Sequence, residues 1–266
     1  MDEKTPQLET HIAEDVHNWE EVKRFLEENK SKILYPVSEK IKFWKRGTEE
    51  IETTKKEKIY RPIWFIRGYY LCEYLRDNVY RIEIEDKVKK AIRENEELKI
   101  KESSSQKKFA LIPDIIETVE INNQKTLQIK DYPQEEELKQ SSVLSSLTGF
   151  LSSKSGTKTI DVRDLKTEQV ESLRDYLQET VDPELKFTIL EPQKNESFII
   201  NLLKEKIIQK PKEFKEILKQ EFVLTDFRLI YCPVYNICLE SEEKRVELEI
   251  DALTRELSKK GEEEIS

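Results

Sequence analysis

Two stretches of the chain share one pattern of apolar and polar positions. The first, Tyr60–Ile84, begins with an apolar run that contains Pro62 and ends in Val79–Glu85, where apolar and charged residues alternate. The second, Leu229–Ile250, begins with a similar run and ends in the alternating segment Val246–Ile250. Strict alternation is typical of a strand with one buried face and one face in water. Because a polar break separates the two runs in each copy, the pattern predicts two β-hairpins.

The first copy is longer than the second. Pro62 and Pro233 lie 171 positions apart, whereas Ile84 and Ile250 lie 166 apart, so the first copy has five additional residues. We place them around Gly68, where they would form either a lengthened, bulged strand or a loop that reaches a ligand. The turn of this hairpin is expected at Arg76-Asp77-Asn78, because Asp and Asn tolerate left-handed backbone.

Apolar residues at helical spacing precede both hairpins. The first of these helices is expected to begin after Asn18, a suitable N-cap, with Trp19, Val22 and Leu26 on its apolar side. Further helices are expected over residues 88–98, 167–177, 198–207 and 212–220. A third hairpin is expected over residues 109–129, with its turn at Asn122-Asn123.

These elements predict an α+β fold of two related units, each an antiparallel hairpin or meander with helices on one face. Seven serines and two glycines dominate Ser141–Thr159, which indicates a flexible linker or, alternatively, a short motif that docks a partner through its apolar residues. The predicted organisation is a polar leader (1–17), an N-terminal unit (18–140), the linker (141–159), a C-terminal unit (160–257) and a polar tail (258–266).

Charge and hydropathy limit the class of protein. The net charge is −9 and 38% of the residues are charged, which disfavours non-specific binding of DNA by the whole surface but allows a local basic patch. No apolar run approaches the roughly 20 residues that cross a bilayer, and the acidic start Met1–Lys4 is unlike a signal peptide. We therefore expect a cytoplasmic protein without a membrane partner.

The sequence offers no convincing metal or cofactor site. His11 and His17 are six positions apart, which places them on different sides of a helix. The cysteines Cys72, Cys232 and Cys238 form no Cys-x-x-Cys pair, so we expect reduced, buried thiols. No metal, no cofactor and no catalytic residue is therefore predicted.

Two pairs of acidic residues allow one catalytic alternative. Glu83 and Glu85, like Glu247 and Glu249, alternate with apolar residues, so both carboxylates of a pair share one strand face. Such a pair could bind Mg²⁺ in a nuclease, and a lysine lies near each pair. The simpler interpretation is a solvated strand face.

The densest mixture of aromatic and basic residues lies in the first copy. On one exposed sheet face these residues could stack the bases of a single-stranded nucleic acid. Alternatively, the aromatic rings belong to the core and the arginines lie at its rim. The candidate binding residues are Tyr60, Arg61, Trp64, Arg67, Tyr69 and Arg76.

The Tyr-x-Pro strand with its hairpin, followed by Asp251 and Thr254, resembles small β-rich modules of uncharacterised archaeal proteins. Some of these modules are attached to HerA/FtsK-type ATPases. The resemblance covers roughly a quarter of the chain and implies no ATPase activity, because the chain has no phosphate-binding loop. The chain also departs from such modules in having no glycine after Thr254.

On function, the sequence favours a non-enzymatic binding or adaptor protein, an accessory subunit of a larger intracellular assembly with a protein partner. This expectation depends on the duplicated scaffold and on the lack of a catalytic set. The alternative is a single-stranded nucleic-acid binding protein that uses the aromatic and basic stretch, or a Mg²⁺-dependent nuclease that uses Glu83 and Glu85.

Overall fold

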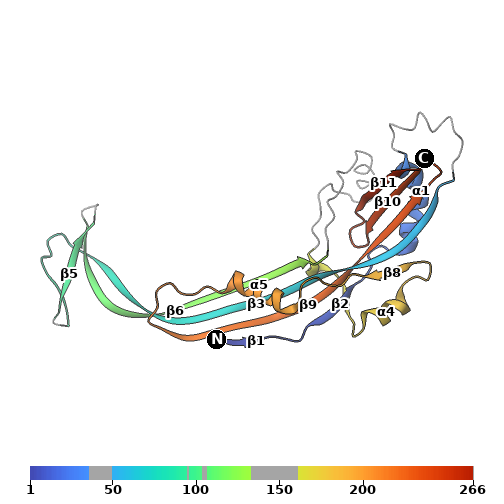
Figure 1. The fold of residues 1–266 in the computed structure, drawn as a ribbon. Coiled ribbons are helices and arrows are strands. Elements are labelled where there is room, and N and C mark those ends of the chain that lie inside the picture. The colour runs from blue at the N-terminus through green and yellow to red at the C-terminus, as the bar shows by residue number, and fades with distance from the viewer. Residues whose placement is uncertain (36–49, 95, 104–106, 133–160, 266) are drawn as a thin grey trace. The chain divides into compact units, whose positions relative to one another are not determined.

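The computed structural model describes residues 1–35, 50–94, 96–103, 107–132 and 161–265, and these residues form a mostly β protein (Figure 1). The helices are α1 (Trp19–Leu34), α4 (Leu173–Thr180) and α5 (Glu196–Ile207), with a short 3-10 helix at Val162–Asp164. The strands are β1 (Asp2–Lys4), β2 (Glu9–Ala13), β3 (Glu52–Ile84), β4 (Ala91–Arg93), β5 (Glu96–Glu102), β6 (Lys108–Lys130), β7 (Thr167–Gln169), β8 (Lys186–Ile189), β9 (Glu216–Glu240), β10 (Lys244–Asp251) and β11 (Leu257–Glu264).

The described strands belong to one mixed sheet. Its main order is β11-β10-β9-β3-β6-β5-β4, so the three longest strands are neighbours at its centre. β1 and β2 pair with β9 in parallel, β7 pairs with β2, and β8 pairs with β3 in parallel. The expected α+β fold of two helix-packed units is therefore wrong, because strands rather than helices make up most of the structure.

The first predicted hairpin does not exist. β3 continues through Arg76-Asp77-Asn78 without turning, although these residues favour a turn. The segment is held extended by β6, because Glu117 accepts hydrogen bonds from the side chains of Arg76 and Asn78 and from the hydroxyl of Tyr80. Tertiary pairing thus outweighs the local preference for a turn.

The second predicted hairpin is present. β9 and β10 pair antiparallel, from Arg245 opposite Glu240 to Asp251 opposite Val234. The chain leaves this hairpin through a turn at Asp251, whose Oδ1 accepts hydrogen bonds from the backbone N–H groups of Leu253 and Thr254. The two similar stretches of sequence therefore form different structures, since only the second forms a hairpin.

The predicted helices are confirmed where the apolar face is long. α1 begins after Asn18, whose side chain accepts a hydrogen bond from Glu21 N, and α5 covers the predicted residues 198–207. By contrast, residues 88–98 form β4 and part of β5, and β9 begins at Glu216 inside the predicted helix over 212–220. The third hairpin is also wrong, because β6 passes straight through Asn122-Asn123. The apolar residues of a short segment can fit the period of a helix or that of a strand, and pairing with a neighbouring strand decides which one forms.

The described chain divides into two compact units, each assembled from separate segments. Unit 1 comprises Met1–Pro6, Arg67–Lys125 and Asn201–Thr225, and unit 2 comprises Gln7–Ile66, Thr126–Ile200 and Asp226–Ser266. The predicted leader supplies β1 to unit 1 and β2 to unit 2, and the predicted tail contains β11. The predicted linker, Ser141–Thr159, lies outside the described residues.

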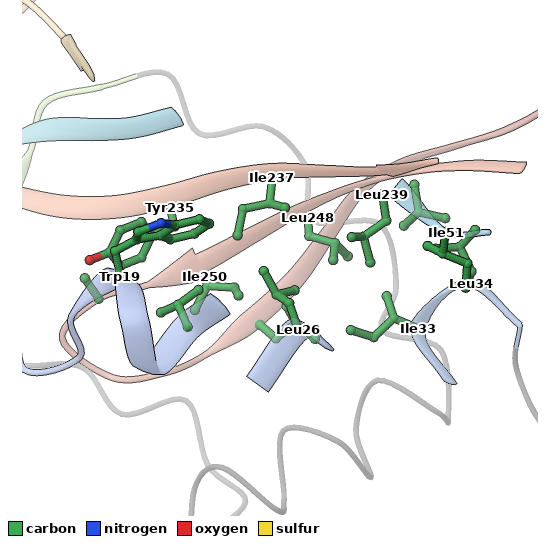
Figure 2. Close-up of a cluster of buried hydrophobic side chains, with 14 of the residues drawn as sticks. Trp19, Leu26, Ile33, Leu34, Ile51, Tyr235, Ile237, Leu239, Leu248 and Ile250 are labelled. Carbon is green, nitrogen blue, oxygen red and sulfur yellow. The ribbon is translucent and has the colours of Figure 1, made fainter. Parts of the chain in front are cut away.

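A large core cluster lies in unit 2, between α1 and the β9–β10–β11 part of the sheet. Figure 2 shows Trp19 and Leu26 of α1 facing Tyr235, Leu248 and Ile250 of the strands. The rings of Trp19 and Tyr235 lie with their centroids 5.8 Å apart. The apolar face of α1 is therefore covered by the alternating side chains of the second predicted hairpin.

In unit 1, the part of α5 that belongs to this unit, residues 201–207, lies against one face of the sheet. Gly68, Tyr70, Cys72 and Tyr74, at every second position of β3, are buried on this face. A Cβ atom at Gly68 would lie 2.7 Å from the carbonyl oxygen of Val223 and 3.2 Å from a methyl group of Leu203 in α5. Gly68 therefore marks a close approach of β3 to β9 and α5 inside a continuous strand.

Candidate interaction surface

The face of unit 1 opposite α5 carries the other half of the β3 side chains. Successive residues of a strand point to opposite faces, so Tyr69 and Leu71 lie on the face away from Tyr70. Both are half-buried, and Val79, farther along the same face, is 51% exposed. This face has only partial cover over its apolar residues.

The neighbouring strands extend the same face. Glu117 of β6 contacts Tyr80 on the α5 side, so the adjacent Ile116 lies on the opposite side with Val79. In β9, Gln220 donates a hydrogen bond of 2.9 Å to Tyr70 on the α5 side, so Ile217, an odd number of positions away, also lies on the opposite side. We call the surface formed by Tyr69, Leu71, Val79, Ile116 and Ile217 the open face.

Exposed apolar side chains are concentrated in unit 1. Of the twelve large apolar residues that are exposed in the described part of the chain, nine belong to this unit. Unit 1 is nevertheless the smaller of the two units. They lie on both faces of the sheet, since Tyr80 is on the α5 side and Val79 is on the open face. Exposed apolar residues that gather on one face mark a site of interaction with another molecule. The nine residues are Met1, Val79, Tyr80, Ile82, Ile92, Ile116, Phe214, Ile217 and Leu218.

Two of the predicted binding residues belong to the core. Tyr60 and Trp64 are each only 2% exposed. The Trp64 ring stacks on Phe227 with centroids 5.8 Å apart, and its Nε1 donates a hydrogen bond of 2.9 Å to Asp131. A nucleic-acid base can stack only on an exposed ring, and both rings are buried. Neither residue can therefore bind a base in this conformation.

Asp131 is the centre of a buried polar network in unit 2. Its carboxylate has no exposed surface and accepts hydrogen bonds from the backbone and the ammonium group of Lys194, at 2.8 and 2.7 Å, besides that from Trp64. Burial alone would raise the pKa of Asp131, but the bonds from Lys194 and Trp64 outweigh it and lower the pKa below its usual value. The network fixes the end of β6 against the segment that leads into α5.

Arg61 forms a second buried ion pair. Its guanidinium donates two hydrogen bonds to the carboxylate of Glu249, at 2.6 and 2.5 Å, and stacks 4.9 Å from the ring centroid of Tyr132. Lys260 lies 3.4 Å from the same carboxylate. The Arg61 side chain is only 18% exposed, and its charge is paired with that of Glu249 within unit 2.

The other three predicted residues lie in unit 1. Arg67 and Tyr69 are half-buried on the open face, whereas Arg76 is exposed and pairs with Glu117 at 3.0 Å on the α5 side. The six candidates are thus divided between two units and two faces of β3. The structure does not bring them together into one aromatic and basic surface.

Three of the four carboxylates in the acidic pairs are engaged in ion pairs. Glu83 contacts Lys107 at 2.9 Å, Glu247 contacts Arg245 at 3.3 Å, and Glu249 binds Arg61. Among the described residues, no group of three His, Cys, Asp or Glu side chains has the arrangement that holds a metal ion. The three cysteines are free and buried, and burial raises the pKa of Cys232 to about 12.

The two histidines do not form a site together. His11 lies 3.2 Å from the hydroxyl of Thr167 and 3.0 Å from the carboxylate of Glu9. His17 lies 3.1 Å from Glu21. His17 also borders a pocket of about 250 Å³ in unit 2, which is lined by both apolar and charged side chains. The pocket is lined by His17, Glu21, Val22, Arg24, Phe25, Glu28, Ile250 and Arg255.

Of the residues that define the open face, only Tyr69 was predicted as a binding residue from the sequence. One signal was present, because Ile115-Ile116 breaks the alternation of β6 and forces one of the two side chains onto each face. The exposure of Ile217 gave no such signal, since its segment was assigned to a helix.

Comparison of the chain with protein-family models, with curated proteins and with solved structures found no match. None of the described helices is both long and apolar enough to cross a membrane.

Proposed function

We propose that the chain is a non-enzymatic binding or adaptor protein, an accessory subunit of a larger assembly, and that the open face of unit 1 contacts its protein partner. One observation carries the proposal: the large apolar side chains of Val79, Ile116 and Ile217 on this face are exposed. Burying such residues in an interface removes apolar area from water, at a gain of roughly 25 cal/mol for each Å².

The character of the open face fits a protein partner better than a nucleic acid. Ile116 and Val79 are aliphatic and more than half exposed, at 53% and 51%. Of the predicted binding residues, Tyr60 and Trp64 are buried in unit 2, and the two that lie on this face, Arg67 and Tyr69, are half-buried. Aliphatic side chains pack against other apolar side chains, whereas strands of nucleic acid are held by exposed aromatic rings and by cations.

The test compares complexes recovered from native lysate, with the full chain as bait. The double variant Val79→Lys/Ile217→Lys places two charges on the open face, where both positions are already in contact with water. We expect proteins captured by the unmodified chain to be lost from this variant. The matched control is Val16→Lys, which changes an apolar residue of unit 2 that is 59% exposed.

Thermal melts of the three proteins should be similar, since the substitutions are on the surface. Recovery of the unmodified chain as a free monomer would count against the proposal. Retention of all captured proteins by the double variant would also contradict it.

A further inference from the structure

In the part of the chain that the structure describes, one edge of the sheet in unit 1 is only partly paired. β6 has β3 on one side and β5 on the other, but the β5 pairing covers only Lys108 to Leu111. β6 itself continues to Lys130. From Ile115 to Ile121, therefore, no described strand pairs with β6 on the β5 side. We call this segment the open edge.

The backbone of such an edge offers hydrogen-bond donors and acceptors to another chain. Alternate residues of an antiparallel strand point their N–H and C=O groups to alternate sides, so the open edge presents a row of donors and acceptors at every second residue. The spacing and direction of these groups fit another extended chain. An edge therefore selects a β-strand as its occupant, whereas an apolar face by itself does not.

The open edge lacks lysine and proline, which usually prevent such pairing. Natural proteins protect exposed edges with charged residues, especially lysine, and with proline. β11, at the other end of the strand order, carries Lys259, Lys260 and Gly261. From Phe109 to Gln124, by contrast, the sequence contains neither lysine nor arginine, in a chain with 46 of them. Pro113 precedes the open edge and lies outside it.

The side chains of the open edge favour a strand, and a basic one. Ile115, Ile116, Thr118, Val119 and Ile121 are β-branched residues that suit a pleated sheet. The charges between them are both acidic, at Glu117 and Glu120. Arg76 compensates Glu117, whereas Glu120 is exposed and has no partner among the described residues.

We propose that the open edge pairs with an extended, basic strand of a partner protein, which adds a strand to the sheet beyond β6. This deepens the proposed function and rests on it, because it names the kind of partner segment that binds unit 1. A second copy of this chain is a poorer occupant. Self-pairing would bring the acidic residues of both copies along one seam, and like charges across a strand pair are destabilising.

The probe is a fluorescent nine-residue peptide in which lysine alternates with valine, flanked by threonine. The full-length protein is titrated into it at low and at physiological salt, and a peptide with glutamate in place of lysine serves as the comparison. We expect the basic peptide to bind and to bind more weakly at the higher salt concentration. The acidic peptide should not bind.

The position of the peptide is read from backbone amide exchange by mass spectrometry. Binding should slow exchange in fragments that cover residues 112–122. Glu120→Lys reverses the charge at the open edge and should weaken binding of the basic peptide about fivefold or more. The matched control, Glu85→Lys, reverses the charge of another exposed residue of unit 1 and should change binding by less than twofold.

Two results would overturn the proposal. One is failure of the basic peptide to slow amide exchange in residues 112–122, whether or not the peptide binds. The other is a concentration-dependent dimer of the protein alone that protects the same fragments, which would make a second copy the occupant. Both results are distinct from failure of the proposed function, since proteins captured from lysate could still depend on Val79 and Ile217 of the open face.

Discussion

Trp64 Nε1 donates a hydrogen bond of 2.9 Å to Oδ2 of Asp131, a carboxylate with no exposed surface. The two residues are 67 positions apart. The bond joins the middle of β3 to the residue that follows β6, the neighbouring strand in the sheet. It makes one aromatic ring both a packing group and a donor to a buried charge. The stability of unit 2 should therefore depend on both properties of Trp64.

Replacement of Trp64 by alanine tests this dependence. The change removes the stacking on Phe227 and one donor to Asp131, and we expect a loss of about 3–5 kcal/mol in the free energy of unfolding. Trp64→Phe keeps most of the ring but not the donor and should cost less. Urea unfolding of both variants measures the difference. A loss below about 1 kcal/mol for the alanine variant would show that the ring is not part of the core.

Asp131 should make stability depend on pH. Because the hydrogen bonds from Lys194 and Trp64 hold its pKa below the usual value, its contribution is present above about pH 3.9 and is lost as the pH falls through the lowered pKa. The stability difference between the unmodified protein and Asp131→Asn should thus be larger at pH 6 than at pH 3. Denaturant unfolding at the two pH values measures it, and an equal difference at both would contradict the lowered pKa.

Removing one partner of the Arg61–Glu249 ion pair should lower the free energy of unfolding more than replacing both partners by apolar residues. Glu249→Gln leaves the Arg61 guanidinium largely buried without its carboxylate, and we expect a loss of about 3 kcal/mol. The double variant Arg61→Met/Glu249→Leu removes both charges and should lose less than this single change. A double-mutant cycle by urea unfolding makes the comparison. Additive losses would show that the two side chains do not interact.

Gly68 and Gly261 form a matched pair for a steric test. Alanine at position 68 would place its Cβ 2.7 Å from Val223 O, a backbone atom that cannot turn away, so we expect a loss of about 1–3 kcal/mol. Alanine at position 261 meets no atom within 4 Å and should be neutral or slightly stabilising. Thermal melts compare the two variants. Equal melting temperatures would mean that β9 does not approach β3 so closely at this glycine.

The sequence by itself determined the elements with strong local signals. α1 has an N-cap at Asn18 and an apolar face that recurs over four turns, and α5 has a continuous apolar side, so both helices form where predicted. The β9–β10 hairpin was also correct, because its alternating return strand and its break at Ser241 agree with each other. In these segments the local preference and the tertiary partner favour the same structure.

Only the tertiary structure decided the rest. Arg76-Asp77-Asn78 and Asn122-Asn123 favour turns locally, but both lie in strands whose neighbours supply backbone and side-chain partners along their length. A turn preference is worth less than the ladder of hydrogen bonds that a turn would break. The same holds for the predicted binding stretch, because whether Trp64 stacks on a base or on Phe227 depends on a strand 163 positions away.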